Sequence, residues 1–176
     1  MKEEKTQKTV PKPEAGAGVS CLDTINDIAV YLRNSGLPES RSAVIIPMMI
    51  VRRLECDLKE TKDSVLDLVK KEPSISAVRL FRAAGRGFYN TCDRSLAEIS
   101  GDGPEAASGL IRYINGFSSN VREILAVFDL PSSIRKLERS GCLCDVIRLF
   151  SEIDMSPSRY DSFKLGEMLE MAMSVQ

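Results

Sequence analysis

Histidine and tryptophan are both absent from this chain of 176 residues. The lack of histidine removes the commonest general base, so catalysis by a Ser–His or Cys–His pair is excluded. Cysteine is sparse, odd in number and without a C-x-x-C pair; the five residues are Cys21, Cys56, Cys92, Cys142 and Cys144. A disulfide framework is therefore not expected, no metal site is predicted, and a reducing cytoplasm is the predicted location.

Long apolar runs are also lacking. The longest, at 43–51, has nine residues and contains Pro47, whereas a membrane span needs about 18 or more. Residues 1–19 have no apolar segment of the secretory type and are rich in Lys, Glu, Pro and Gly, so they are predicted to form a disordered tail. The net charge of −1 means that any DNA contact must come from a local patch or from partners.

Residues 20–176 show the spacing of amphipathic helices and are predicted to form one domain. The clearest apolar stripes are Leu22, Ile25, Ile28, Ala29 and Leu32; Val121, Ile124, Leu125 and Phe128; Leu143, Val146, Ile147, Phe150 and Ile153; and Leu165, Met168, Leu169 and Ala172. No internal repeat and no alternating strand pattern accompanies them. The predicted fold class is all-α, a compact multi-helix bundle.

Local signals add further helices and some of their ends. Helical spacing between proline and glycine punctuation predicts helices at 40–58, 62–71, 75–84 and 104–114. Pro47 predicts a kink or a helix start within the first of these. Ser118 or Asn120 is predicted to cap the helix after Gly116, and Asn120 with Glu123 fits a capping box. Residues 85–103 are predicted to be the least regular part.

Two glycine-containing stretches, 85–87 and 101–104, are candidates for phosphate loops. A dinucleotide or S-adenosylmethionine site needs such a loop directly after a strand, so that the amides of a helix N-terminus face the ligand. No strand is predicted before either stretch. Both are interpreted as turns, and no cofactor-binding residue is predicted in this chain.

Basic residues supply candidates for phosphate contact. Arg79, Arg82 and Arg86 stand at i, i+3 and i+7, and would line one face if their helix extends that far. In the functional interpretation, the three arginines contact successive phosphates of a nucleic-acid backbone. In the alternative, they are only the solvated face of a helix. Arg52 and Arg53 project about 100° apart on a helix, so one is expected to pair with a carboxylate internally while the other reaches outward.

Methionines gather near the end of the chain, where four of the seven lie at 155–173. An apolar helix in this position needs cover from the bundle, from a second copy or from a missing domain. Methionine suits an adaptable partner surface. Met168, Met171 and Met173 are therefore candidate partner contacts.

Four blocks of sequence carry a specific resemblance. They are IPMMIVRRLECDLKETKDSVL at 46–66, FYNT at 88–91, YINGFSSNVREIL at 113–125 and FSEIDMSPSRYDSFKLGEMLE at 150–170. In this order they resemble the N-terminal helical domain of the modification (methyltransferase) subunits of type I restriction–modification systems. The opening helix matches loosely, and Glu167 stands where the family has a tyrosine.

The resemblance implies a helical module beside a larger α/β domain that binds S-adenosylmethionine and methylates adenine N6. That domain uses an Asn-Pro-Pro-Tyr/Phe motif, which this sequence does not contain. No catalytic or cofactor residue is therefore carried over, and the catalytic domain is expected to be missing from this chain. The implied role of the helical module is to help enclose DNA and to contact neighbouring subunits, including the specificity subunit.

The leading hypothesis is a non-catalytic module of a DNA adenine methyltransferase subunit. It would help to clamp double-stranded DNA and dock the specificity subunit and the catalytic domain, with a second copy as a further candidate partner and no membrane contact. The candidates for DNA contact are Arg52, Lys62, Arg79, Arg82 and Arg86. The alternative is a stand-alone interaction module, a remnant or decoy without a DNA role. The chain by itself is not predicted to be an enzyme.

Overall fold

Helices make up most of the computed structural model, which describes residues 21–37 and 41–174. The α-helices are α1 (Cys21–Asn34), α2 (Ile46–Leu58), α3 (Lys62–Lys71), α4 (Ala77–Ala84), α5 (Leu96–Ser100), α6 (Ala106–Asn115), α7 (Ser119–Ala126), α8 (Leu130–Arg139), α9 (Leu143–Glu152) and α10 (Ser162–Ser174). A π-helical turn, η1 (Arg41–Ile45), precedes α2, and a 3-10 turn, η2 (Gly103–Glu105), precedes α6. The all-α prediction is confirmed. The predicted tail at 1–19 lies outside the described residues.

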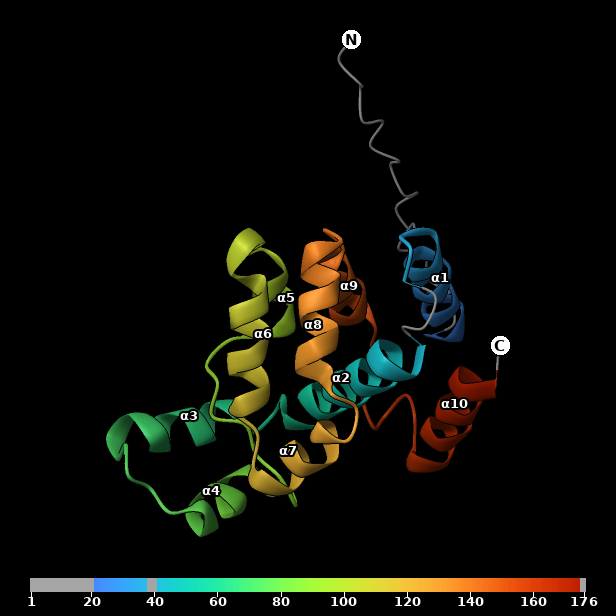
Figure 1. Cartoon of the computed structure of the whole chain (residues 1–176). Coiled ribbons are helices and arrows are strands. Elements are labelled where there is room, and N and C mark those ends of the chain that lie inside the picture. The colour runs from blue at the N-terminus through green and yellow to red at the C-terminus, as the bar shows by residue number, and fades with distance from the viewer. Residues whose placement is uncertain (1–20, 38–40, 175–176) are drawn as a thin grey trace.

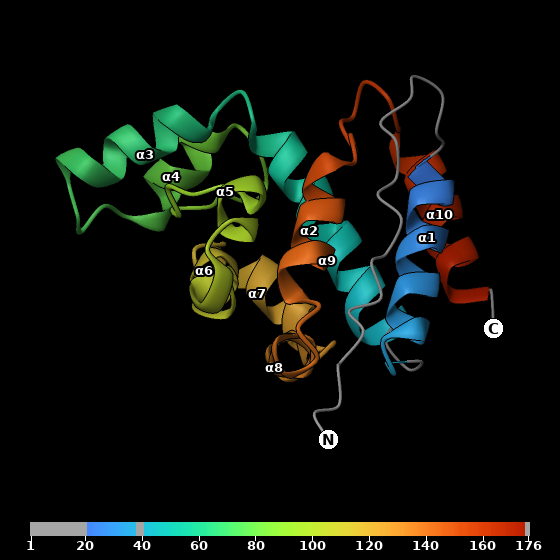
Figure 2. The ribbon, with the colours of Figure 1, turned by 90° about the horizontal axis from the view of Figure 1, so that it is seen from above.

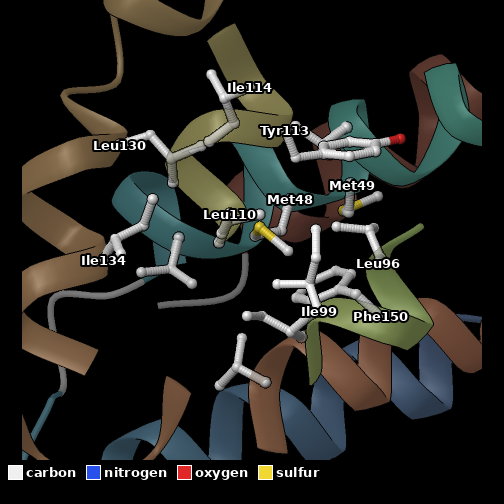
Figure 3. Packing of buried hydrophobic residues seen from close by; sticks show 14 of the residues in the cluster. Met48, Met49, Leu96, Ile99, Leu110, Tyr113, Ile114, Leu130, Ile134 and Phe150 are labelled. Atoms are coloured by element: carbon white, nitrogen blue, oxygen red, sulfur yellow. The ribbon is translucent and has the colours of Figure 1, made fainter. Parts of the chain in front are cut away.

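The core is built around α2. Met48, Met49 and Val51 of this helix are at most 1% exposed, and α2 is contacted by η1, α9 and α10. Figure 3 shows Met48 and Met49 gathered with side chains from α5, α6, α8 and α9. Full burial of each such side chain contributes about 1.5–3 kcal/mol. The apolar run at 43–51 is thus explained by packing on several sides.

Helices α3 and α4 stand apart from the rest of the bundle. They pack mainly on each other, and Figures 1 and 2 show them on the opposite side of the molecule from α1 and α10. Only Val65 of α3, and Leu80 and Ala84 of α4, are buried. We call residues 62–87 the α3–α4 lobe. No helix in the described part of the chain is long and apolar enough to cross a membrane.

Several predicted boundaries are confirmed. The helix predicted at 62–71 has these ends, and Pro47 lies in the first turn of α2, where its missing N–H costs no helical hydrogen bond. The stripe from Leu143 to Ile153 is buried at every predicted position.

Other local predictions are only partly right. Residues 85–95 form no helix, as expected of the least regular part, but Leu96–Ser100 form a short helix, α5, with a capping box made by Ser95 and Glu98. Of the two predicted caps, Ser118 takes the N-cap position of α7, although its side chain makes no capping hydrogen bond, and the capping box at Asn120 does not form. The Asn120 side chain instead donates a hydrogen bond to the Gly87 carbonyl at 2.8 Å. Ile124, predicted to be in the apolar stripe of α7, is 54% exposed.

Candidate nucleic-acid interface

The double arginine of α2 is directed into the fold. Arg52 Nε donates to the Ile153 carbonyl at 2.7 Å, and its guanidinium pairs with Glu55 at 2.6 Å. The other Glu55 oxygen accepts a 2.8 Å hydrogen bond from the Leu96 amide at the start of α5. Both side chains are less than one-fifth exposed. One ion pair therefore joins α2 to the start of α5 and the end of α9.

The neighbouring arginine is tied down as well. Arg53 Nε lies 3.1 Å from an Asp57 carboxylate oxygen, and its guanidinium donates to the Tyr160 carbonyl. The residue is 8% exposed. The expectation that one of the two arginines reaches outward is wrong, because backbone carbonyls after α9 accept hydrogen bonds from both. Arg52 is thereby removed from the surface that could touch a phosphate.

A second junction joins the blocks at 88–91 and 113–125. Asn90 and Phe117 form an isolated antiparallel bridge. The Thr91 amide donates to the Gly116 carbonyl at 2.9 Å, and the Ser118 amide donates to the Tyr89 carbonyl at 3.0 Å. Because Asn90, Phe117 and Ser118 are all buried, these bonds are shielded from water. This junction holds the loop after α4 against the end of α6.

Asn90 supplies the polar centre of this second junction. Its Nδ2 donates to the Tyr113 carbonyl at 3.1 Å, and its Oδ1 accepts from the Cys92 amide at 2.8 Å. Gly116 is needed beside it, since a Cβ there would lie 2.4 Å from Asn90 Oδ1. Burial also raises the pKa of Tyr113 well above its usual value, so its hydroxyl stays protonated. The blocks that carry the family resemblance thus pack against one another.

Lys62, another DNA-contact candidate, is engaged within the chain. Its ammonium group donates a 2.7 Å hydrogen bond to the Arg94 carbonyl. Arg94 in turn makes a two-pronged pair with Asp102, with one contact of 2.8 Å, and this bonding holds the pKa of Asp102 below its usual value. Lys62 is half-buried and therefore tethers the α3–α4 lobe to the loop before α5.

The three remaining candidates lie on the surface of the α3–α4 lobe. Arg79 pairs with Glu72, both side chains being half exposed, and such a surface pair is weak. Helix α4 ends at Ala84, because Gly85 takes a left-handed conformation and its amide bonds back to Phe81. Arg86 therefore does not continue the helical face of Arg79 and Arg82, contrary to the predicted stripe.

Arg82 and Arg86 keep free charges in the lobe. Both are exposed, and neither forms an ion pair with any residue that the structure describes. The lobe as a whole carries six Lys and Arg residues against three Asp and Glu residues, whereas residues 140–174 carry three against six. Helix α10 carries one Lys against two Glu residues. Since Figures 1 and 2 place the lobe away from α10, the net positive lobe and this net negative helix lie on different sides of the molecule.

Of the three methionines predicted to contact a partner, the structure describes the side chain of Met168 alone. Met168 is only 4% exposed, because α10 packs on η1 and α2. The bundle itself covers this residue, so it is not an exposed partner contact. The side chains of Met171 and Met173 lie outside the described part of the structure.

The glycine stretches do not fit a nucleotide cofactor. Gly85 terminates α4, and Gly101 follows α5 with its amide bonded to Glu98 and Ile99 carbonyls. Their amides therefore do not present a helix N-terminus to a ligand. A cavity beside Glu55, Lys62 and Tyr113 has a volume of about 20 Å³, far below the several hundred Å³ of small-molecule sites. Neither glycine stretch therefore forms the loop that a nucleotide cofactor requires.

Burial makes two of the cysteine thiols less acidic. Burial raises the pKa of Cys21 to about 11 and also raises that of Cys56, so both remain weakly nucleophilic thiols near neutral pH. Among residues 21–37 and 41–174, no group of three or more His, Cys, Asp or Glu side chains is arranged to hold a metal ion.

Comparison with known families decides the identity of this helical module. The sequence model of the HsdM N-terminal domain matches residues 23–150. The chain belongs to the HsdM N-terminal domain family. The family is that of the modification subunit of type I restriction–modification systems, so the resemblance drawn from the four blocks is confirmed. Searches of curated proteins and of solved structures gave no match.

Two of the residues that carried the resemblance lie in the buried polar junctions. As an HsdM N-terminal domain, the chain is a module of a complex that contains other subunits. The residues that carried the resemblance, such as Arg52 and Gly116, hold this module together. The expected internal pairing of an arginine with a carboxylate is confirmed by Arg52 with Glu55 and by Arg53 with Asp57. The sequence interpretation missed the role of Glu55 as acceptor for the Leu96 amide and the role of Asn90 as donor to the Tyr113 carbonyl.

Proposed function

We propose that this HsdM N-terminal domain helps to grip double-stranded DNA in its modification complex, with the α3–α4 lobe as the contacting part. The observation that carries the proposal is the pair of exposed, unpaired arginines, Arg82 and Arg86, on a net positive lobe. Adenine methylation requires the base to leave the duplex, so the complex must hold the backbone on both sides of it. Arginine suits this task because its planar donors match phosphate oxygens.

The module is also proposed to dock the specificity subunit and a methyltransferase domain. Support comes from family membership and from two exposed apolar residues at the end of α7, Ile124 and Val127, which are 54% and 82% exposed. Neighbouring apolar side chains of this kind are typical of the centre of a protein interface. S-adenosylmethionine binding is assigned to that methyltransferase domain, because the turns of this chain do not fit the cofactor.

Removal of the two lobe charges is expected to weaken DNA binding and its salt dependence. The variant Arg82→Gln/Arg86→Gln is to be assembled with the other subunits and titrated with nonspecific duplex DNA over a range of salt concentrations. Each lost phosphate contact lowers the slope of log affinity against log salt by about 0.9, so the expected drop is about 1.8.

The matched control removes two exposed cations from outside the lobe, with Arg33→Gln/Lys164→Gln. Neither side chain forms an ion pair within the described residues, and the net charge changes by the same amount. The control slope should equal that of the unchanged complex. If the lobe variant also keeps the full slope, the DNA role is wrong and an interaction module without DNA contact is favoured.

A further inference from the structure

Helix α8 carries a second cationic surface, which sequence patterning did not single out. Arg135, Lys136 and Arg139 are all exposed. At 100° per residue they fall within an arc of about 100°. Leu130, Ile134 and Leu137 occupy the other side of α8 and are buried. We call the three basic residues the α8 ridge.

The charges of the α8 ridge are unpaired, in contrast to those of the arginines in α2 and α9. In α9, Arg148 lies 3.7 Å from Asp145 and 3.1 Å from Glu152, and the arginines of α2 pair with Glu55 and Asp57. No residue of the α8 ridge forms an ion pair with the described part of the chain. The only acidic residue within 135–139 is Glu138, so the ridge keeps a net positive charge.

The position of the α8 ridge separates it from the α3–α4 lobe. Figures 1 and 2 show α6 between α8 and α3. The α8 ridge and the α3–α4 lobe are therefore carried by helices on either side of α6. A single phosphate backbone that crossed α6 would pass both of these elements.

We propose that the α8 ridge is a second binding surface for the phosphate backbone of duplex DNA; this inference rests on the proposed DNA role of the module. The two arginines supply forked donors that match phosphate oxygens, and the lysine supplies a point charge. Such contacts are independent of base sequence. They add affinity and fix the orientation of the module on the duplex.

Helix-dipole stabilisation and an acidic protein partner fit the α8 ridge less well than phosphate does. Lys136 and Arg139 lie in the last turn of α8, where cations stabilise a helix through its dipole, but Arg135 lies outside that turn. An acidic protein partner would normally need apolar side chains at the centre of its contact. None of the large apolar residues that are exposed in the described part of the structure lies on α8. The composition of the ridge therefore favours phosphate binding.

The test compares Arg135→Gln/Arg139→Gln with the control Arg33→Gln/Lys164→Gln in the assembled complex. Arg33 matches Arg139, because each is a basic residue in the last turn of its helix. The ridge variant should lower the salt slope for nonspecific duplex DNA by about 1.8, and the control should leave it unchanged. Arg135→Lys/Arg139→Lys should keep most of the slope, since it preserves the charges.

Three results would overturn the inference. A full salt slope for the ridge variant, with a lowered slope for Arg82→Gln/Arg86→Gln, means that the α8 ridge does not touch DNA although the lobe does. If both variants keep the full salt slope, neither the lobe nor the α8 ridge contacts DNA, and the proposed function is wrong as well. Weaker association with the other subunits at an unchanged slope identifies an acidic protein surface as the ligand of the ridge.

Discussion

Replacing Gly116 with alanine is expected to be the most destabilising single change in the second junction. The new Cβ would lie 2.4 Å from Asn90 Oδ1 and 2.9 Å from the Cys92 amide nitrogen. Overpacking of this kind costs about 1–3 kcal/mol, and displacement of the buried Asn90 side chain leaves polar groups unpaired at about 1–3 kcal/mol each. The free energy of unfolding should therefore fall by about 3–5 kcal/mol in urea titrations.

Gly87→Ala is the matched control for this prediction. A Cβ at Gly87 would meet nothing within 4 Å, and its backbone has no positive φ. Alanine there should change stability by less than about 1 kcal/mol. If both variants unfold at the same urea concentration, the close packing of Gly116 against Asn90 is not a constraint on the fold.

Replacing Glu55 with alanine is expected to have the second-largest effect. Removal of the carboxylate leaves the mostly buried Arg52 without its ion-pair partner and the Leu96 amide without its acceptor. Breaking a buried pair from one side costs about 3–5 kcal/mol. Glu55→Gln should lose less, because an amide oxygen can still accept one of the two hydrogen bonds. Urea unfolding followed by circular dichroism measures both variants.

Glu60→Ala provides the comparison for a carboxylate outside the network. Glu60 is exposed just after α2, and a surface change of this kind should cost less than about 0.5 kcal/mol. An equally small loss for Glu55→Ala would show that the contacts from α2 to α5 and α9 contribute little.

The helices with long apolar stripes were predictable from the sequence, because their spacing reports directly which face is buried. The stripe of α9 is the clearest case, and Pro47 marked the start of α2 through its missing N–H. Helix α5 was missed, since five residues are too few to show a helical period. Its Ser95–Glu98 capping box was nevertheless visible, and it would have located the start of the helix.

The sequence was less informative about which charged side chains lie in solvent, where they could contact a ligand. Arg52 and Arg82 have the same side chain, and only tertiary contacts place one against the Ile153 carbonyl and the other in solvent. The end of α4 at Gly85 also separated Arg86 from the expected stripe. The family resemblance singled out residues such as Arg52 and Gly116 without indicating their role. In the structure, these residues stabilise the packing of the helices.

The central claim is that residues of the family blocks build the module while the α3–α4 lobe touches DNA. Photo-cross-linking in the assembled complex tests it most directly, with a benzophenone side chain in place of Arg86 and, as control, in place of Lys164 on α10. We expect adducts with duplex DNA from position 86 and none from position 164. Adducts from position 86 that contain only protein, or DNA adducts from position 164 alone, would contradict the claim.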